Sequence, residues 1–499
     1  MSAYFSGKHV VVTGAGVSGR GCARLLAQLG AEVTVVDANP QALDIVSSAG
    51  DGVHTMCADA ALAALHKHSL VPALVVTSPG WRPDSPLLTE FRDQGIEVIG
   101  DVELAWRLDQ QEVFGPTRRW LAITGTNGKT TTTGMLAAIM QADGQVTHRR
   151  AEAAGNIGRS VFELLADRQR VDDVVVELSS FQLHWSQTIQ PAVGVLLNLS
   201  GDHLDWHGSF SAYAAAKAKV LRGNVAVIGR DDERVRAIVA DGATAPDEST
   251  PVVAFTLNVP EPGEVGVRDA WLVDNQVQPT VGFSTAGSLP CELAPVEGIE
   301  PPGAAGLADA AAAATAARSV GALPESIRTG LAAYRVDGHR GALVANVNGI
   351  AYVDNSKATN PHAADAALSG VEHVVWIAGG QLKGAVVRDV IAKHRSRLRA
   401  VVILGADRAN IAAAVSELAP GVPVEDIAET HPQRAMDAVV AAARRHAEAG
   451  DTVLLAPAAA SLDMYSGMAQ RGDAFAAAVR SQTSGKDPSD TSATGESHS

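Results

Sequence analysis

The chain has 499 residues, of which 46% are hydrophobic, and it carries a formal net charge of −15. That length suits about three domains of ~150 residues, and the acidic balance argues against nucleic acid as a partner, because phosphate backbones require a basic surface. No apolar run reaches the ~18 residues needed to span a bilayer, and the N-terminus lacks a signal-peptide pattern. Three widely spaced cysteines fit a reducing compartment. We therefore expect a cytoplasmic protein that binds small molecules and contacts no membrane. A monomer is expected as well, although nothing in the sequence determines the oligomeric state.

Strand and helix signals alternate over about the first hundred residues, which predicts a doubly wound parallel sheet. The turn Gly14-Ala-Gly-Val-Ser-Gly19 opens the first helix, and Asp37 closes the next strand at the spacing of a dinucleotide-binding unit. Such a turn favours a nucleotide or diphosphate at the helix N-terminus; a turn that needs glycine for backbone reasons only is the alternative. Ser78 and Gly80 also follow a strand, where ligands gather in open sheets. Strands are predicted at residues 8–14, 31–37, 73–77 and 97–99.

A polar stretch at residues 109–119 predicts a linker to a second α/β unit. Residues 229–303 are rich in Pro and Gly and predict irregular or small-sheet insertions, and the alanine-rich stretch 304–320 predicts a helix. A third α/β unit begins near residue 335, and the polar residues 482–499 are expected to be disordered. Strands of these two units are predicted at residues 120–124, 173–178, 193–199, 225–228, 350–354, 374–378, 400–404 and 452–456.

Residues 121–131 carry the most informative motif. An apolar strand runs into the loop Gly125-Thr126-Asn127-Gly128, and Lys129, Thr130 and Thr131 open a helix. The N–H groups of such a loop and the helix N-terminus favour a bound phosphate. Lys129 is expected to reach the β- and γ-phosphates of ATP, and Thr130 to hold Mg²⁺. The general phosphate-loop pattern is incomplete, because Ile123 stands where it has its first glycine. An ordinary strand–turn–helix corner is the alternative.

Polar groups also follow later strands of the second unit. Glu177 ends an apolar strand and suits Mg²⁺ beside a phosphate loop; a solvent-facing glutamate is the alternative. His203 is expected to ligate a metal or to bind phosphate, and His207 to lie at the surface. Lys217 and Lys219 follow on an alanine-rich helix, where lysines usually serve as solvated faces. If such a lysine is buried instead, its amine pKa falls and a neutral amine can take up CO₂.

The third unit has similar loops at its predicted strand ends. Lys357 stands at a strand-to-loop corner, from which it is expected to face the γ-phosphate across a domain cleft. The segment 378–384 offers a second anion site, and the segment 457–463 follows another strand. For each segment alone, a loop without function is the alternative. Their shared position at strand C-termini favours ligand binding.

Together these motifs resemble the Mur ligase family, the ATP-dependent amide ligases of peptidoglycan synthesis, over the whole chain except its tail. The resemblance rests on the phosphate loop and on the segments 155–158, 177–183, 202–205, 354–360 and 461–472. It is greatest to the branch that adds D-glutamate to UDP-N-acetylmuramoyl-L-alanine. The implied α/β fold has a Rossmann-like UDP-substrate domain (1–113), a P-loop ATPase-like central domain (114–334), a Rossmann-like amino-acid domain (335–481) and a disordered tail (482–499).

The resemblance also implies individual roles. ATP forms an acyl phosphate on the substrate carboxylate, which the D-glutamate amine then attacks. The implied catalytic residues are Lys129, His203, Lys217 and Lys357. Two Mg²⁺ ions are implied on Thr130, Glu177, His203 and a carbamylated Lys217. ATP contacts are implied for Gly125, Thr126, Asn127, Gly128, Lys129, Thr130, Thr131, Arg340 and Thr359. Substrate contacts are implied for Val17, Ser18, Asp37, Ser78, Gly80, Asn156, Ser179, Lys357, Lys383 and Ser461.

The chain departs from the family pattern at three places. Ala305–Asp309 replaces a His-Asn-x-x-Asn pattern that touches adenine, so no adenine contact is assigned there; Gln381 replaces an acid, and Met468 an aromatic residue. Four alternative functions remain at this point: a sister ligase for another amino acid, a folate polyglutamate ligase, a nicotinamide oxidoreductase built on the first glycine turn, and a non-enzymatic nucleotide-binding module.

Overall fold

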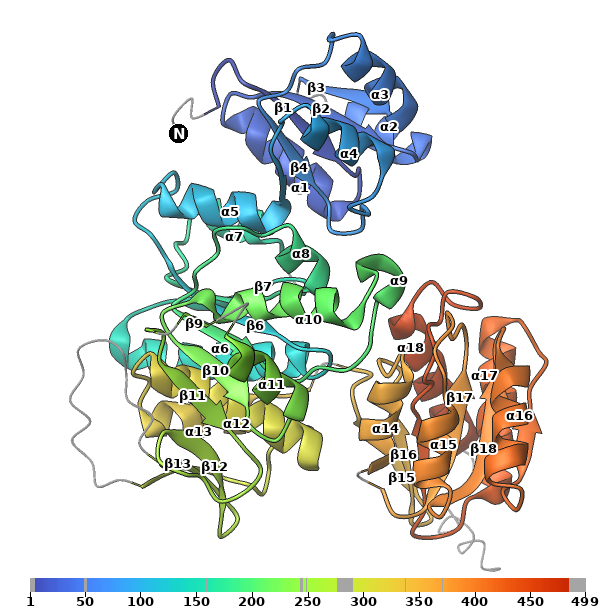
Figure 1. The fold of residues 1–499 in the computed structure, drawn as a ribbon. Helices are drawn as coiled ribbons and strands as arrows, with labels where there is room; N and C mark the ends of the chain where they lie inside the picture. Colours follow the sequence, from blue (N-terminus) through green and yellow to red (C-terminus); the bar gives the residue numbers. More distant parts are fainter. Residues whose placement is uncertain are drawn as a thin grey trace, which may run out of the picture. The chain divides into compact units, whose positions relative to one another are not determined.

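The computed structural model describes residues 5–48, 52–157, 159–242, 246–247, 249–275, 290–336, 338–369 and 371–483. The chain forms two compact units: Met1–Ile299 with Gly306–Tyr334, and Glu300–Ala305 with Arg335–Ser499 (Figure 1). The predicted disordered tail lies outside the described residues from residue 484 on, whereas its first two residues belong to the last helix. No helix in the described ranges is long and apolar enough to cross a bilayer.

The first sheet is parallel throughout, in the order β3-β2-β1-β4-β5. Apolar side chains alternate across it: Val10 and Val12 pack toward α1 and α5, whereas Val11 and Val75 pack toward α3 and α4. This is the predicted doubly wound sheet, with one added strand, β3, that the sequence analysis missed. The elements are β1 His9–Thr13, α1 Val17–Gln28, β2 Glu32–Asp37, α2 Pro40–Ser48, β3 Val53–Cys57, α3 Ala58–His66, β4 Leu74–Thr77, α4 Pro86–Asp93, β5 Val98–Gly100 and α5 Asp101–Gln110.

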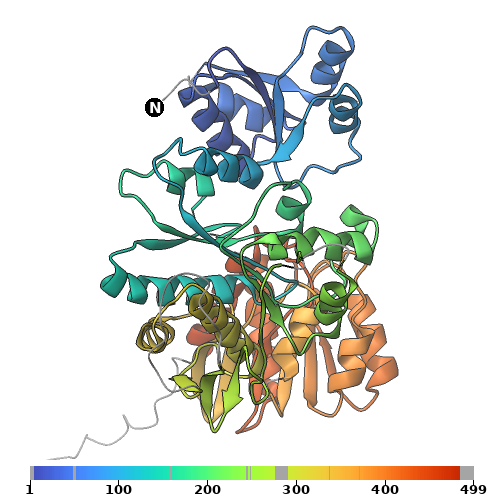
Figure 2. The same cartoon turned by 60° about the vertical axis from the view of Figure 1, so that its left-hand side comes forward.

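The second sheet has the order β14-β13-β12-β11-β10-β9-β6-β8-β7. Its strands are parallel from β7 to β12, and the antiparallel β13 and β14 form the small-sheet insertion predicted for residues 229–303. Helices α6, α12 and α13 cover one face (Figure 2). The elements are β6 Arg119–Thr124, α6 Lys129–Thr147, β7 Ala151–Gly155, α7 Val161–Leu165, β8 Asp173–Glu177, α8 Ser180–His184, β9 Val193–Leu196, α9 Leu204–His207, α10 Phe210–Ala218, η1 Lys219–Arg222, β10 Ala226–Gly229, α11 Glu233–Asp241, β11 Val252–Phe255, β12 Glu264–Arg268, β13 Trp271–Asn275, β14 Cys291–Pro295, α12 Ala304–Ser319 and α13 Pro324–Ala333.

The third sheet belongs to the second unit and has the order β15-β16-β20-β17-β18-β19, with β15 antiparallel at its edge. Helices α14, α15 and α16 cover one face, and α17 and α18 cover the other. The three sheets confirm the predicted α/β fold with three domains. The elements are β15 Ala342–Val347, β16 Ile350–Asp354, α14 Pro361–Ser369, β17 Val374–Gly379, α15 Arg388–His394, β18 Leu398–Leu404, α16 Arg408–Leu418, β19 Val424–Asp426, α17 Pro432–His446, β20 Thr452–Leu455 and α18 Met468–Thr483.

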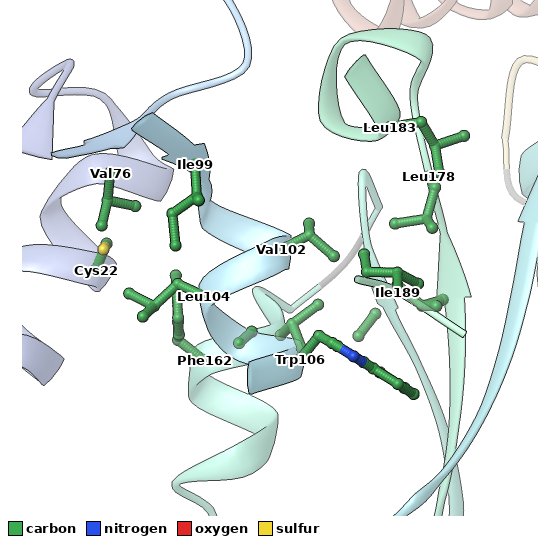
Figure 3. Packing of buried hydrophobic residues seen from close by; sticks show 14 of the residues in the cluster. Cys22, Val76, Ile99, Val102, Leu104, Trp106, Phe162, Leu178, Leu183 and Ile189 are labelled. Carbon is green, nitrogen blue, oxygen red and sulfur yellow. The ribbon is translucent and has the colours of Figure 1, made fainter. Parts of the chain in front are cut away.

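Helix α5 packs the first sheet against the middle one. Figure 3 shows Leu104 beside Cys22 and Ile99, whereas Val102 and Trp106 lie toward side chains of the middle domain, Leu178, Leu183 and Ile189. All of these residues belong to one buried cluster. Burial of this continuous apolar surface, at about 25 cal/mol per Å², therefore stabilises the two domains as one unit.

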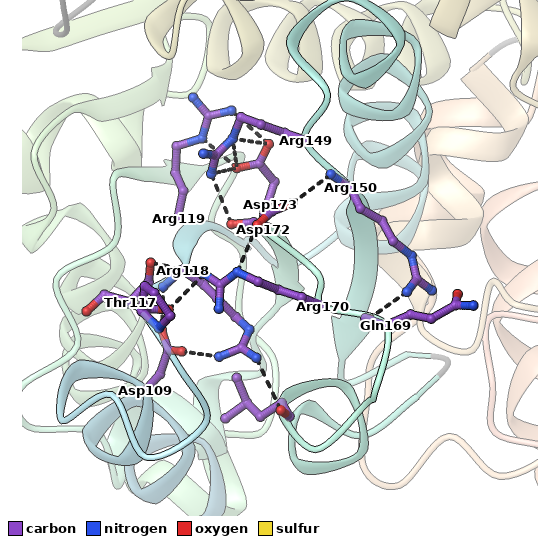
Figure 4. A network of polar contacts seen from close by, with 12 residues as sticks. Asp109, Thr117, Arg118, Arg119, Arg149, Arg150, Gln169, Arg170, Asp172 and Asp173 are labelled. Atoms are coloured by element: carbon purple, nitrogen blue, oxygen red, sulfur yellow. Dashed lines mark hydrogen bonds and ion pairs between the residues drawn. The ribbon is translucent and has the colours of Figure 1, made fainter.

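The predicted linker at residues 109–119 is a packed segment with charged groups inside it. Asp109 and Arg118 are both buried, and their ion pair measures 2.6 Å (Figure 4). Asp109 also accepts the Trp120 indole N–H at 2.9 Å. The charged residues of this segment predicted an exposed linker, because a sequence does not reveal which charges pair with one another. In the fold, these two charges are buried as a hydrogen-bonded pair.

Candidate active site

The first glycine turn joins β1 to α1, and Asp37 fixes its backbone. The Asp37 carboxylate accepts the N–H groups of Ala15 and Asn39 at 2.6 Å and 2.8 Å. A Cβ on Gly19 would overlap the Gly14 carbonyl oxygen, so the close approach of helix and turn requires glycine there. The Ser78 hydroxyl beside this turn is buried without a hydrogen-bond partner among the described residues. Buried polar groups are normally paired, which makes Ser78 a candidate ligand contact. The Val17 side chain lies outside the described residues.

Ser18 points from this turn toward the middle domain. Its hydroxyl hydrogen-bonds the carboxylate of Asp101, whose pKa is raised by burial and lowered in part by this bond. A cavity of about 20 Å³ lies between Ser18, Asp101, Gly155 and Ser160. This is room for about one water molecule. Ser18 therefore lies where the first and the middle domain meet.

The phosphate loop lies between β6 and α6. Side chains that follow β9 in the chain hold its backbone in place. The Asn198 amide brackets Asn127, accepting its N–H at 2.9 Å and donating to its carbonyl at 3.2 Å. Thr126 exchanges a hydrogen bond with the Tyr213 hydroxyl at 2.8 Å, and the Lys129 ammonium donates to the Thr126 carbonyl at 2.9 Å. Asn127 Nδ2 is buried without a partner in the described part of the chain. A donor placed in this way suits an anionic ligand.

Glu177 joins two of the predicted site residues at the end of β8. One oxygen accepts the Thr130 hydroxyl at 2.6 Å, and the other accepts the Asn156 amide at 2.9 Å. The side chain is almost fully buried, which excludes the solvent-facing alternative. A hydroxyl and a carboxylate beside a phosphate loop are oxygen donors of the kind that Mg²⁺ prefers, so these residues fit the metal that the sequence motif implies. Ser179 serves as the N-cap of α8, with its hydroxyl accepting the Gln182 N–H.

Lys217 lies on α10 and is 2% exposed, so it is not a solvated lysine. Its Nζ donates to the Gly125 carbonyl at 2.7 Å and to the Thr124 hydroxyl at 3.2 Å. Burial lowers the pKa of this amine well below its usual value, and the nearby Lys129 lowers it further, whereas Asp202 and Glu177 act in the opposite direction. Burial beside the phosphate loop therefore disfavours the charged form of this amine.

Lys219 faces away from that loop. Its Nζ donates to three carbonyls at the end of α8, those of Leu183, His184 and Ser186, at 2.8–3.0 Å. Three acceptors use all three hydrogens of an ammonium group. Burial lowers the pKa of Lys219 only to about 8. The structure thus separates two lysines that the sequence placed two positions apart.

His203 is the N-cap of α9, and its ring packs on Phe181 at a centroid distance of 4.7 Å. Burial lowers the pKa of its imidazole, and Asp202 offsets part of this effect. His207 is half-buried: its Nε2 lies 3.0 Å from the Ser180 hydroxyl, and burial lowers its pKa to about 4. The prediction of a surface histidine at 207 is therefore wrong, because α9 folds back onto α8. In the described ranges, no group of three or more His, Cys, Asp or Glu side chains could hold a metal ion.

Asp309 is a residue that the sequence analysis left without a role. It lies on α12, where its carboxylate accepts the Thr132 hydroxyl at 3.0 Å and lies against Gly128 of the phosphate loop. The Asp309 side chain is buried against the phosphate loop. The segment 305–309, which replaces the family's adenine-contact pattern, therefore packs against this loop. The sequence feature that could have pointed to Asp309 is its position as a single acidic residue within an alanine-rich helix.

Five further predicted residues lie in the second unit, on loops around the carboxyl ends of its strands. Lys357 and Thr359 follow β16, Lys383 follows β17, and Ser461 follows β20, while Arg340 precedes β15. The loops of Lys383 and Ser461 are joined by two hydrogen bonds between Gln381 and Ala460, at 2.8 Å and 2.9 Å. Ser461 is buried. The approach of Arg340, Lys357 and Thr359 to ATP stays a prediction.

Comparisons with known proteins agree with the division of the chain into three α/β domains. Family models match three segments: "Mur ligase MurD-like, N-terminal domain" over residues 8–100, "Mur ligase middle domain" over 123–258, and "Mur ligase, glutamate ligase domain" over 339–459. A relative from Corynebacterium diphtheriae, named UDP-N-acetylmuramoylalanine–D-glutamate ligase, is 51% identical over 472 residues, or 94% of this chain and 95% of its own. A relative of the same name from Corynebacterium efficiens is 50% identical over 478 residues, or 96% of each chain.

A solved structure shares the fold. The UDP-N-acetylmuramate–alanine ligase of Thermotoga maritima superposes with a TM-score of 0.54 at 17% identity, covering 95% of this chain and 99% of its own. At that identity the likeness concerns architecture alone. With family models on all three α/β domains, and with relatives about half identical along nearly the whole length, this chain belongs to the Mur ligase family.

Proposed function

We propose that this protein is an ATP-dependent ligase that joins D-glutamate to UDP-N-acetylmuramoyl-L-alanine, releasing ADP and phosphate, in peptidoglycan precursor synthesis. The observation that carries the proposal is the phosphate loop with Lys129, Thr130, Glu177 and Lys217 around it, in a chain whose relatives at about 50% identity carry that ligase's name. A nicotinamide oxidoreductase would need none of these four groups.

The reaction follows from the chemistry of a carboxylate, which is a poor acylating agent. The alanyl carboxylate oxygen attacks the γ-phosphorus of ATP, the bond to ADP breaks, and an acyl phosphate forms. The D-glutamate amine then attacks the acyl carbon, and phosphate leaves as the amide forms and the amine loses a proton. Lys129 and the N–H groups of the 125–128 loop hold the transferring phosphate, because phosphoryl transfer depends on positioning and charge neutralisation. His203 adds a further donor beside them.

Magnesium, when bound, neutralises charge on the phosphate oxygens. We assign two ions to the set formed by Thr130, Glu177, His203 and a carbamylated Lys217. Burial lowers the pKa of the Lys217 amine, which supports this modification: the uncharged amine adds to CO₂ and releases a proton, which leaves an anionic oxygen ligand. Lys219 is assigned no such role, because its three carbonyl partners hold it as an ammonium ion.

The carbamate is tested with ¹³C-bicarbonate and NMR of the wild-type protein. A carbamate carbon signal is expected in the wild type and in Lys219→Arg, and none in Lys217→Arg. A signal that survives in Lys217→Arg but disappears in Lys219→Arg would reverse the assignment.

We further propose three domains: 1–113 for the UDP substrate, 114–334 for ATP and 335–481 for D-glutamate. Ser78 and Asn127, buried donors without partners among the described residues, support ligand contacts in the first two domains. We place the UDP substrate against Val17, Ser18, Asp37, Ser78, Gly80, Asn156 and Ser179, the amino acid against Lys357, Lys383 and Ser461, and Arg340 and Thr359 on ATP. We also propose that the protein is a monomer, which light scattering of the purified chain tests. We propose a cytoplasmic location as well, and the three cysteines, which form no disulfide in the described residues, support it.

The decisive experiment is phosphate release from ATP by the purified full-length chain. Release is expected only when UDP-N-acetylmuramoyl-L-alanine and D-glutamate are both present, and L-glutamate, D-alanine or a folate with glutamate should not replace them. Release with one of those instead would assign a sister or folate ligase. Oxidation of a nicotinamide without ATP consumption would refute the proposal.

A further inference from the structure

The loop that follows β4 places two side-chain donors beside the first glycine turn. A Cβ built on Gly14 would overlap the Ser78 hydroxyl and would lie 3.4 Å from the Trp81 indole nitrogen, and a Cβ built on Gly19 would lie 3.3 Å from the same hydroxyl. The backbone N–H of Trp81 donates to the Ser78 carbonyl at 3.1 Å, which closes a tight turn between these two residues. The Ser78 hydroxyl and the Trp81 indole therefore converge on the turn between β1 and α1.

The Trp81 ring is held in place, yet its indole N–H has no acceptor in the described part of the chain. The ring is partly buried against the cluster that contains Leu65, Leu88 and Phe91. The Ser78 hydroxyl beside it is likewise buried without a partner among the described residues. An indole nitrogen is a donor only, and it usually finds an acceptor when its ring is buried. Two fixed donors at one place therefore indicate a ligand that accepts hydrogen bonds.

The turn itself offers donors to an anion. Helix α1 has 12 residues and begins after Gly16, which has no side chain to cap it, and no acidic residue stands in its first turn. The first N–H groups of such a helix suit an anionic ligand. Two charged side chains at the turn are bound to its backbone: Asp37 accepts the Ala15 N–H at 2.6 Å, and Arg20 donates to the Ala15 carbonyl at 3.1 Å. An anion here therefore depends mainly on neutral N–H and O–H donors.

We propose that Trp81 is a further substrate-binding residue: its indole N–H donates to a diphosphate oxygen of the UDP substrate, together with the Ser78 hydroxyl and the first N–H groups of α1. The inference rests on the proposed function, which places the UDP substrate at this turn, and it adds a donor that the sequence motifs did not indicate. The diphosphate is the part of the substrate that a helix N-terminus attracts, and an indole nitrogen can only donate to it.

The test measures UDP binding to the purified full-length chain by calorimetry, and the KM for the UDP substrate by phosphate release. Trp81→Phe keeps an aromatic ring in the cluster and removes the N–H. The Kd for UDP and the KM for the UDP substrate should therefore each rise roughly tenfold, the scale of one hydrogen bond to a charged acceptor. The KM values for ATP and D-glutamate should change by less than about twofold. Uridine, which lacks phosphates, should bind both chains equally.

Trp185→Phe is the matched control. Trp185 belongs to the same buried cluster, and its indole N–H is also buried without a partner among the described residues. It follows α8 rather than β4, so the same substitution there should leave the Kd for UDP unchanged. If Trp81→Phe does not fold, Trp81→Leu decides by the same measurements.

Three results would contradict a role of Trp81 at the diphosphate. An unchanged Kd for UDP in Trp81→Phe, or an equal rise in Trp185→Phe, would overturn the inference. An equal loss of affinity for uridine would place the indole on the base and would overturn it as well. A wild-type chain that binds UDP but consumes no ATP with D-glutamate sinks the proposed function instead, and the comparison of Kd values still decides the inference.

Discussion

The two glycine turns of the first unit look alike in sequence but differ in the charges around them. Both connect a parallel strand to a helix, and both motifs predict a phosphate. At the first turn the fold places two carboxylates, Asp37 on the Ala15 N–H and Asp101 on the Ser18 hydroxyl. At the second it places the Lys129 ammonium on the Thr126 carbonyl and the buried Lys217 amine on the Gly125 carbonyl, with Glu177 on Thr130, so the positive charge at this turn is that of Lys129.

This difference suits two different tasks. A turn that only binds a ligand needs a fixed backbone. A carboxylate that accepts the backbone N–H groups of the turn fixes it. A turn that must help transfer a phosphoryl group needs positive charge where negative charge accumulates. From this comparison we propose that the first turn binds a ligand and that the second turn takes part in the chemistry.

Removal of the ammonium group at the second turn should have the largest effect. Lys129→Ala is expected to lower the rate of phosphate release by roughly 10³-fold, because it removes a preorganised cation from the transferring phosphate. Lys67→Ala, at an exposed lysine, should match the wild type. Substantial turnover in Lys129→Ala would remove the assignment of chemistry to this turn.

Removal of the negative charge of Glu177, beside the second turn, should have the next largest effect on the rate. Glu177→Gln keeps an oxygen acceptor for Thr130 but removes the negative charge that suits Mg²⁺, so kcat should fall by roughly 10²-fold and saturation should need more magnesium. A magnesium titration of initial rates measures this. An unchanged midpoint would place the metal elsewhere.

A methyl group at the first turn should separate binding from folding. A Cβ on Gly16 meets nothing within 4 Å, so Gly16→Ala should fold normally, with stability within about 0.5 kcal/mol of the wild type. If a diphosphate approaches the turn, the KM for the UDP substrate should still rise roughly tenfold, with ATP affected little. Gly21→Ala on the same helix, where the nearest atom is 3.9 Å away, is the control. Equal KM values for both variants would contradict the binding role.

The support behind the second turn should appear mainly in stability. Thr132→Val removes the donor to buried Asp309 and should lower the free energy of unfolding by about 1–3 kcal/mol. Thr133→Val removes a hydroxyl that donates to the Lys129 carbonyl within the helix, and it should cost less. Denaturant unfolding of the two variants makes the comparison, and equal losses would argue against a special role of Asp309.

A further effect is a pH dependence of stability that arises at His184 on α8. Burial lowers the pKa of His184 to about 4, and Lys219 and Arg92 add to the shift, whereas an unfolded histidine titrates near 6.5. Between these values the unfolded chain binds more protons, so the unfolding free energy should fall as the pH drops from about 6.5 to 4. His184→Gln should reduce this slope. His207, with a similar shift, should keep part of it.

The sequence by itself determined the order of strands and helices, both glycine turns and the family, because these depend on residues close together in the chain. Strands β3, β7, β15 and β19 escaped it, and so did the buried pair of Asp109 and Arg118. Sequence spacing could not distinguish Lys217 from Lys219, since only the path of α10 decides which amine meets the phosphate loop.

The tertiary structure alone decided how distant charges are compensated. Asp309 reaches Thr132 from 177 positions away, and Arg471 reaches Ser356 from 115 positions away. Burial and pairing set the charge state of such groups, and both arise only when separate elements pack together. Local patterns therefore show where a ligand can bind, whereas long-range packing determines which groups are charged there.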